Sequence, residues 1–171
     1  MAVLPIIMIP DPILRKISDP VETIDSAVVR LMDDMLDTMY AAPGIGLAAV
    51  QVGVPRRIVV LDAADEGEEK KPLAMVNPEI VAIGQTTRLY EEGCLSIPDI
   101  RVDIERPETV TVSYIDRQGK RQELAAEGLL ATAIQHELDH LDGQLIIDYL
   151  SRLKRDMIIR KFKKQSRDEK L

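Results

Sequence analysis

The hydrophobic and polar positions of this chain repeat with a helical period near both ends and with shorter apolar runs between them. From Asp25 to about Tyr40 the apolar residues recur every three to four positions, which predicts one buried helix face. Asp25 is a residue type that caps helix N-termini. The methionine-rich face is typical of a core rather than of a ligand site. Its apolar residues are Val28, Leu31, Met32, Met35, Leu36 and Met39.

The middle of the chain has the short apolar runs that are typical of strands. Residues 41–46 contain a proline and two glycines and should end the first helix. The run 57–62 predicts a buried strand, and residues 65–71 a charged, exposed loop. The other predicted strands, the last two joined by a turn at 116–119, are 73–76, 86–91, 108–115 and 121–124.

The helical period returns after this region. A second helix is expected over about 127–141, with Gly143 as its stop. Its apolar face carries Leu130, Ile134, Leu138 and Leu141. A third helix, from about Ser151, should bury one stripe of Leu153, Met157 and Phe162.

Helices near the ends and strands between them predict an α+β fold. We expect short antiparallel or mixed sheets packed around the second helix, with one further helix towards each end. Residues 1–171 show no composition shift that would mark a second domain, so the prediction is a single domain with a basic helix or tail at about 151–171.

Composition limits the protein class. The 171 residues are 46% hydrophobic and 30% charged, as in soluble globular proteins, and no apolar run approaches the length of a membrane span. Residues 1–10 contain no basic residue and two prolines, so no signal peptide is predicted. The only cysteine, Cys94, excludes an intrachain disulfide and favours a cytoplasmic location.

The charge is unevenly distributed. The net charge of −7 argues against nucleic-acid binding by the domain as a whole. Residues 151–171 nevertheless carry nine basic and three acidic residues. This tail predicts either a docking site for a polyanion or a solvated helix face that binds nothing. Its basic residues are Arg152, Lys154, Arg155, Arg160, Lys161, Lys163, Lys164, Arg167 and Lys170.

The two histidines of the chain, His136 and His140, are four residues apart on the second predicted helix, with Glu137 between them. Positions i and i+4 share a helix face, so both imidazoles can reach one metal ion. Glu137 is then placed to act as the base for a water on that metal. Asp139 lies outside this pair and should orient a histidine or cap a turn. The pattern predicts a hydrolytic metal site.

A catalytic metal needs a third protein ligand. Cys94 follows Gly93 after a predicted strand, and its thiolate would be a strong ligand for a transition metal. Taken alone, Cys94 would be an inert buried residue; the histidine pair favours the ligand interpretation. Carboxylates such as Asp148 remain an alternative third ligand.

The segment 44–51 is rich in glycine and small residues and ends at Gln51. It could pack closely against a substrate backbone, with the Gln51 amide donating to a developing oxyanion. The alternative is a helix-ending turn followed by a packing surface. No lysine follows as it would in a phosphate loop.

Three segments together resemble the signature motifs of peptide deformylases, in the family's order: Gly44-Ile-Gly-Leu-Ala-Ala-Val-Gln51, Glu92-Gly-Cys-Leu-Ser96 and Gln135-His-Glu-Leu-Asp-His140. The resemblance implies removal of the formyl group from N-formyl-methionyl ends of newly made polypeptides. It also implies one divalent metal held by Cys94, His136 and His140. Iron(II) is the family's usual metal, and zinc, nickel or cobalt can replace it.

The resemblance also implies roles for further residues. The metal would lower the pKa of a bound water to supply a hydroxide, with Glu137 as general acid and base, and the Leu95 N–H and Gln51 amide would stabilise the oxyanion. The residues that would bind the substrate main chain and methionine side chain are Ile45, Gly46, Gly93, Arg101 and Leu129. One departure is Pro43, where many members carry an acidic residue.

Two other functions remain open from the sequence. The first is a zinc peptidase that uses a carboxylate as third ligand. The second is a binding module that acts through its basic tail, although such a module has no need of Gln51 or Glu137. Contact of the tail with the ribosome is a hypothesis compatible with action on nascent chains. No membrane association and no sequence-specific nucleic-acid binding are expected.

Overall fold

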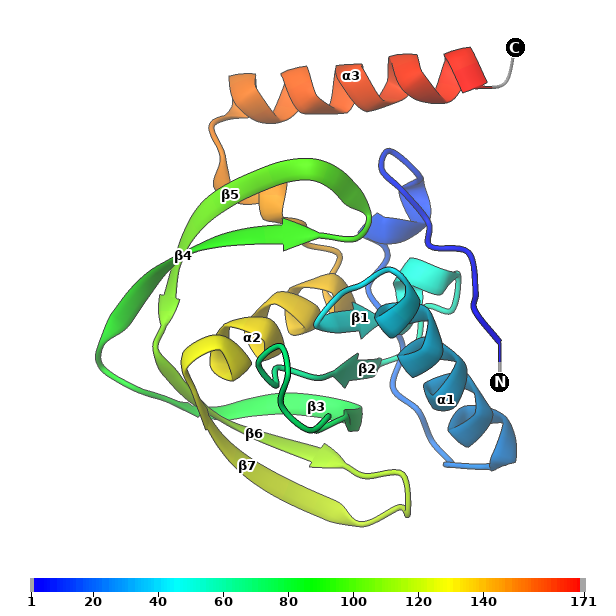
Figure 1. Ribbon diagram of the computed structural model, residues 1–171, viewed down its shortest axis with the longest axis vertical. Coiled ribbons are helices and arrows are strands. Elements are labelled where there is room, and N and C mark those ends of the chain that lie inside the picture. The colour runs from blue at the N-terminus through cyan, green and yellow to red at the C-terminus, as the bar shows by residue number, and fades with distance from the viewer. Residues whose placement is uncertain (1, 170–171) are drawn as a thin grey trace.

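The computed structural model describes residues 2–169 of the chain (Figure 1). Met1, Lys170 and Leu171 lie outside this range, so one basic residue of the predicted tail does too. The helical elements are η1 (Pro12–Arg15), α1 (Ser26–Ala41), η2 (Ala49–Val52), α2 (Gly128–Leu141), η3 (Ile146–Tyr149) and α3 (Arg152–Glu169). The strands are β1 (Gly46–Ala48), β2 (Ile58–Leu61), β3 (Leu73–Ile83), β4 (Thr87–Cys94), β5 (Ile97–Pro107), β6 (Thr109–Ile115) and β7 (Arg121–Glu127).

The α+β prediction is confirmed, with α2 at the centre of the molecule. Five strands form one sheet in the order β1-β2-β3-β6-β7, and β4 pairs with β5 in a separate hairpin. Figure 1 shows α2 between this hairpin and the five-stranded sheet, with α1 at the side and α3 across the top. All strand pairs among the described residues are antiparallel, so the mixed alternative was wrong.

Some strands are longer than the sequence predicted, and two strands were not predicted at all. β3 and β5 each have 11 residues. β3 continues through Asn77-Pro78, which would normally end a strand, because Asn77 adopts a left-handed conformation (φ 50°) and its side chain bonds both backbone groups of Val21. The pairing with β6 shifts register at this point, a β-bulge that lets the strand go on.

The strands β1 and β5 were not predicted. β1 has only three residues and pairs with β2 along the edge of the sheet, so it is too short to show a period. β5 does alternate: Val102, Ile104 and Arg106 are buried at every second position. The charged residue at the third of these positions concealed the strand, because a buried arginine breaks the apolar pattern.

The predicted first helix is confirmed with its cap. The Asp25 side chain accepts a hydrogen bond from the Val28 N–H at 2.9 Å, which satisfies an otherwise free donor of the first turn. Met32, Met35 and Met39 are completely buried against β2 and neighbouring residues. The methionine stripe is therefore part of the hydrophobic core. Its packing fixes the position of α1, and with it the segment that leads from α1 into β1.

The predicted second helix is also confirmed, as α2. Ile134 and Leu141 of its apolar face are fully buried. Its end is set by Gly143, whose φ of 75° is unfavourable for other residues and where a Cβ atom would meet the backbone of Arg15. Nearly every residue of α2 from Ala131 onward is buried, so its polar side chains lie in a water-poor interior.

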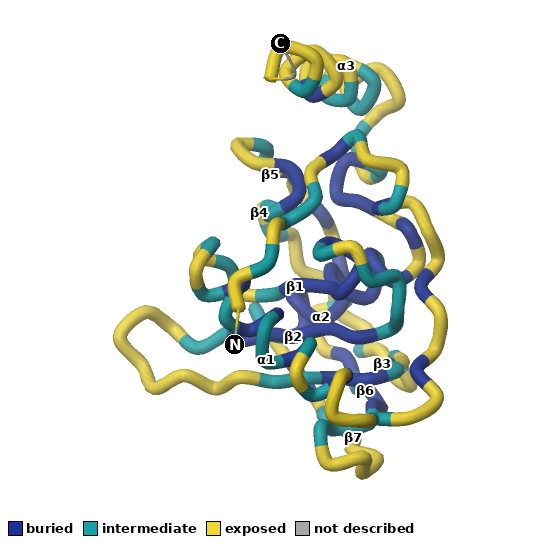
Figure 2. The backbone as a smooth tube through the Cα atoms, turned by 90° about the vertical axis from the view of Figure 1, so that its right-hand side faces the viewer, coloured by how far each residue is buried: buried dark blue, intermediate teal, exposed yellow. Residues whose placement is uncertain are grey.

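The third helix forms, but the predicted apolar stripe was wrong. Leu153 and Met157 are 72% and 60% exposed, whereas Phe162 is buried and packs with Ile158 and Ile159 against the core beside η3. α3 meets the body along one narrow face only, and Figure 2 shows most of its length exposed at one end of the molecule. No helix among residues 2–169 is long and apolar enough to cross a membrane.

Candidate metal centre

A cleft of about 730 Å³ lies where β1, the β4–β5 turn and α2 meet. Ten of the eleven residues predicted from the sequence for metal binding, catalysis or substrate binding line it: Ile45, Gly46, Gln51, Gly93, Cys94, Leu95, Arg101, Leu129, His136 and Glu137. The remaining one, His140, is buried directly beside Cys94. Three segments that are far apart in the sequence are thus brought to one place.

The three predicted ligands form a cluster. The ligand atoms of Cys94, His136 and His140 all lie within 4.8 Å of one another, and Cys94 Sγ is 3.3 Å from His140 Nε2. Sulfur and nitrogen ligands at ordinary metal distances and tetrahedral angles are about 3.5 Å apart. The donor set and its spacing therefore fit a single transition-metal ion.

His140 is held in the form that a metal requires. Burial, reinforced by the nearby His136, lowers the pKa of His140 well below its usual value, so the ring is neutral and keeps a lone pair for coordination. Its other nitrogen, Nδ1, is buried with no hydrogen-bond partner among the described residues.

His136 is oriented by a buried ion pair that was not predicted. Its Nδ1 lies 3.0 Å from Oε1 of Glu92, so Nε2 faces the ligand cluster. Glu92 in turn accepts two hydrogen bonds from Arg106, at 2.7 and 3.0 Å. Burial disfavours the charged carboxylate, but the bonds from His136 and Arg106 outweigh it and lower the pKa of Glu92. The signal in the sequence was Arg106, a charge in phase with the apolar face of β5.

Glu137 has the environment of a proton-transfer group. Its side chain is 4% exposed, and Oε1 has no hydrogen-bond partner among the described residues. Burial is the main cause that raises the pKa of Glu137 to about 7. The Glu92 and Asp139 carboxylates raise this pKa further, whereas the positive charges of His136 and Arg106 lower it. A carboxyl with a pKa near neutrality can both take and give a proton.

Gly46 explains how this carboxyl fits beside β1. A Cβ atom at Gly46 would lie 2.9 Å from Cδ of Glu137 and would contact Oε2 more closely still. Any side chain here would therefore push the carboxyl away from the metal centre.

Gln51 is oriented by the backbone. Its Oε1 accepts the Ala48 N–H at 2.9 Å, which leaves Nε2 to donate to Ser96 Oγ at 3.0 Å and to point at Cys94 Sγ, 3.7 Å away. The side chain is 1% exposed, so the amide N–H is held at the edge of the metal centre in a fixed direction.

The predicted substrate-binding residues form the rim of the cleft. The guanidinium of Arg101 lies over Gly93, where a Cβ atom would be 2.9 Å from Cζ. Ile45 is 41% exposed and its carbonyl accepts the Asp62 N–H at 2.9 Å, which anchors the strand while leaving the side chain at the opening. Leu129, near the start of α2, also lines the cleft.

Two acidic residues near the site have other partners than a metal or a histidine. Asp148 is not a ligand, because its carboxylate accepts two bonds from Arg15, at 2.6 and 2.9 Å, and one from the Leu145 N–H. The Asp139 carboxylate accepts from Arg106 and Tyr149 rather than from a histidine. Its backbone carbonyl does receive the bonds that close the turn after α2.

Comparison with known proteins agrees with this geometry. Residues 3–156 match the family described as polypeptide deformylase. The peptide deformylase of Rhizobium meliloti is 59% identical over 167 residues, which cover 98% of this chain and 96% of that protein. The peptide deformylase of Agrobacterium fabrum is 58% identical over 98% of both chains.

Solved structures match at the level of the backbone. The crystal structure of peptide deformylase from Ehrlichia chaffeensis superimposes with a TM-score of 0.93 at 41% identity, over 99% of this chain and 100% of that one. The Legionella pneumophila structure gives 0.88 at 47% identity over 98% of each chain. With the Cys94, His136 and His140 cluster in place, this chain belongs to the peptide deformylase family.

Proposed function

We propose that this chain hydrolyses the formyl group from N-formyl-methionyl ends of newly made polypeptides and releases formate. The observation that carries the proposal is the buried Glu137 carboxyl, with one oxygen unpartnered, beside the Cys94, His136 and His140 cluster of a deformylase-family chain. We include in it a cytoplasmic location, where Cys94 stays reduced.

The ligand set fits one divalent metal, and we propose iron(II), with zinc, nickel or cobalt as substitutes. Bound there, the metal would supply Lewis-acid polarisation of the formyl carbonyl and lower the pKa of a water at its open position. One thiolate and two imidazoles suit all four ions, so the choice among them rests on the family resemblance and on metal supply.

In this proposal Glu137 moves the protons. Its unpartnered Oε1 accepts a proton from the attacking water, whose oxygen forms a bond to the formyl carbon. The carbon–nitrogen bond then breaks, and the same carboxyl returns the proton to the leaving amine nitrogen. A pKa of about 7 lets the carboxyl be populated in both protonation states at neutral pH, as a group that takes and then returns a proton requires.

The developing negative charge on the formyl oxygen needs donors that are already oriented. Gln51 has an N–H fixed beside Cys94, and the backbone N–H of Leu95 is the second donor that we assign. Preorganised donors of this kind each contribute about 2.7–4 kcal/mol to lowering the barrier.

The rim residues would hold the substrate. We assign Ile45, Gly46 and Gly93 to the peptide main chain, which would add a strand beside β1. Leu129, Ile45 and the aliphatic part of Arg101 would surround the methionine side chain. Their common position on the wall of the cleft supports this assignment.

The test is formate release from a formyl-Met peptide by protein loaded anaerobically with iron(II) or nickel. We expect multiple turnovers, and none on the matching acetyl-Met peptide, because the added methyl group enlarges the acyl group that must fit between the metal and the two donors. No formate from a preparation with metal verifiably bound would overturn the proposal in favour of a peptidase, which a screen with unmodified peptides would detect.

A second proposal concerns α3. We propose that its basic face contacts a polyanionic surface, for which the ribosome is the candidate. Of the eight basic residues described on α3, all but Arg155 are exposed, and Figures 1 and 2 show the helix on the far side of the β4–β5 hairpin from α2. The alternative is a solvated face without a partner.

The test is cosedimentation with ribosomes over a range of salt concentrations. Lys161→Gln/Lys163→Gln/Lys164→Gln should weaken binding and flatten its salt dependence. The matched control, Lys70→Gln/Lys71→Gln/Lys120→Gln, removes the same charge from other exposed positions. Equal binding by the two variants would contradict the proposal.

A further inference from the structure

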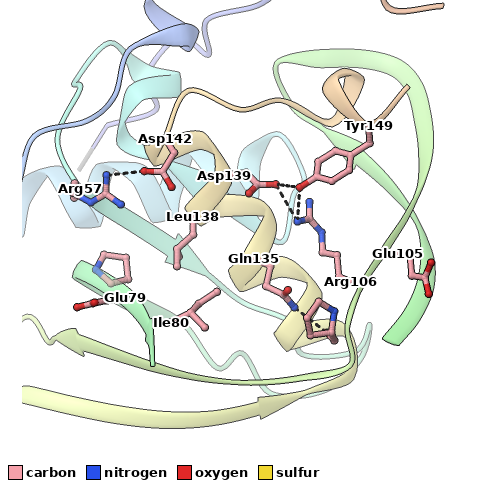
Figure 3. A pocket seen from close by; sticks show the side chains of 12 residues that line it. Arg57, Glu79, Ile80, Glu105, Arg106, Gln135, Leu138, Asp139, Asp142 and Tyr149 are labelled. Carbon is pink, nitrogen blue, oxygen red and sulfur yellow. Dashed lines mark hydrogen bonds and ion pairs between the residues drawn. The ribbon is translucent and has the colours of Figure 1, made fainter. Parts of the chain in front are cut away.

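A line of polar contacts connects the metal centre to the far side of α2. Figure 3 shows its outer part, where the Tyr149 hydroxyl donates to Asp139 Oδ2 at 2.8 Å. Arg106 Nη1 donates to the same carboxylate oxygen at 3.0 Å and to the Tyr149 hydroxyl at 3.2 Å. The other nitrogens of Arg106 hold Glu92, which contacts His136. The line thus runs from Tyr149 to a metal ligand.

Arg106 is the centre of this line and has little freedom. It is 6% exposed, and each of its three nitrogens donates to a partner in the line. A buried cation needs such compensation on every side, because its lost hydration is costly. Glu92 anchors the guanidinium from one side, while Asp139 and Tyr149 anchor it from the other.

Tyr149 is the most exposed member of the line, at 45%. It is the last residue of η3, and its ring also lies 5.1 Å from the Arg106 guanidinium carbon. The Asp139 side chain is 21% exposed, so without the Tyr149 hydroxyl it could turn towards water. Arg106 would then keep Glu92 alone, and the Glu92 oxygen that fixes the His136 ring would lose its rigid support.

We propose that Tyr149 is a positioning residue for the reaction, acting through Asp139, Arg106 and Glu92 on the orientation of His136. The inference rests on one part of the proposed function, namely that His136 binds a metal ion. Tyr149, Asp139 and Arg106 line a separate hollow of about 440 Å³ behind α2, not the substrate cleft. The hydroxyl should therefore affect metal retention and kcat while leaving KM unchanged.

The test replaces only the hydroxyl, in Tyr149→Phe, which keeps the ring over Arg106. The matched control is Tyr40→Phe, which also removes a hydroxyl-to-carboxylate bond, from Tyr40 to Asp62 at 2.6 Å, outside the line. Three quantities are measured: the rate of metal release to a chelator, the absorption bands of the cobalt(II)-loaded protein, and kcat and KM separately.

We expect Tyr149→Phe to release metal about 10-fold faster, at the lower end of the effects known for groups that support metal ligands. The cobalt bands should shift, kcat should fall and KM should stay the same, with none of these changes in metal release or spectrum for Tyr40→Phe. Metal release and spectra of Tyr149→Phe that match those of the parent chain would overturn the inference, as would equal changes in both variants.

A double substitution separates coupling from general destabilisation. In an Asp139→Ala background the acceptor shared by Tyr149 and Arg106 is gone, so Tyr149→Phe should add no further increase in metal release. Additive effects would mean that Tyr149 acts independently of Asp139, which overturns the proposed route. Formate release by the parent chain in the same preparations tests the proposed function separately, because metal release requires no substrate.

Discussion

The helices α2 and α3 have similar lengths but opposite environments. α2 lies between the hairpin and the five-stranded sheet, and its polar residues Gln135, His136, Glu137 and His140 are all buried. α3 lies at one end of the molecule and, of its described residues, buries only Phe162. Polar residues on α2 are costly to bury, and Gln135 and His136 are compensated by hydrogen-bond partners, whereas the charges on α3 remain in water.

This difference shows which part of the fold can hold catalytic groups in fixed positions. In α2 the surrounding strands fix each functional group, so that one helix carries both the Glu137 carboxyl with its raised pKa and the neutral His140 imidazole. On α3 the charges are mobile and screened, and they suit long-range attraction rather than catalysis. We therefore expect substitutions around α2 to change chemistry and substitutions on α3 to leave it intact.

The largest expected effect is that of Cys94→Ala. Removing the thiolate leaves two imidazoles, so the protein should retain no metal after gel filtration and release no formate. The matched substitution, Asp148→Asn, removes the carboxylate that the sequence left open as an alternative ligand. Metal analysis of both variants checks this prediction, and metal lost from Asp148→Asn but kept by Cys94→Ala would reverse the assignment.

The next effect is expected for Gln51→Met, which removes the amide donor at similar volume. We expect kcat to fall by about 10²–10³-fold, the usual loss for one oxyanion donor. The Ala48 N–H loses its acceptor as well, which should cost about 1–3 kcal/mol of unfolding free energy. Steady-state kinetics and thermal unfolding measure the two effects, and an unchanged kcat would remove Gln51 from the mechanism.

A smaller effect is expected for Gly46→Ala. This substitution lies in β1 but displaces a side chain on α2, so it tests whether the neighbouring strand fixes the groups of that helix. The new Cβ atom would displace the Glu137 carboxyl, and a misplacement of about 1 Å costs up to about 10²-fold in rate. The control is Gly44→Ala, whose Cβ would meet only the flexible end of Leu95. If both variants turn over formyl-Met peptide equally well, the close fit at Gly46 has no catalytic importance.

The smallest effect is expected on α3. Leu153→Gln and Met157→Gln replace exposed residues, so the unfolding free energy should change by no more than about 0.5 kcal/mol and kcat not at all. Phe162→Ala is the contrast, because it removes the buried ring that attaches α3 and should speed hydrogen exchange along the helix. A loss of turnover in the two glutamine variants would show that α3 contributes to the site after all.

The sequence predicted the metal-ligand cluster better than the strands. Metal ligation imposes a strict spacing, so the two histidines and Glu137 could be recognised without knowledge of the surroundings. Strand β5 and the extension of β3 depend on tertiary interactions instead. The buried Arg106 is acceptable in β5 because the Glu92 side chain of the neighbouring strand β4 pairs with it, and β3 passes Asn77 because Val21 satisfies its amide.

Tertiary interactions that the sequence does not reveal also explain the wrong apolar stripe on α3 and the unforeseen partners of Asp139. The helical period of Leu153, Met157 and Phe162 was real, but a period does not reveal which neighbours are present, and only Phe162 meets the core beside η3. Asp139 was expected to orient a histidine or to cap a turn; its carboxylate contacts Arg106, on a strand that had not been predicted. Such support for a metal ligand becomes visible only when the fold brings distant segments together.

The most direct test of the account is single-turnover formate release by Glu137→Gln with its metal content measured in the same sample. Glutamine keeps the size of the side chain but can neither accept the water's proton nor return it. We expect full metal occupancy and a rate lower by about 10²–10⁴-fold, the usual contribution of a positioned general acid–base group. A metal-loaded Glu137→Gln protein that releases formate as fast as the parent chain would contradict this expectation.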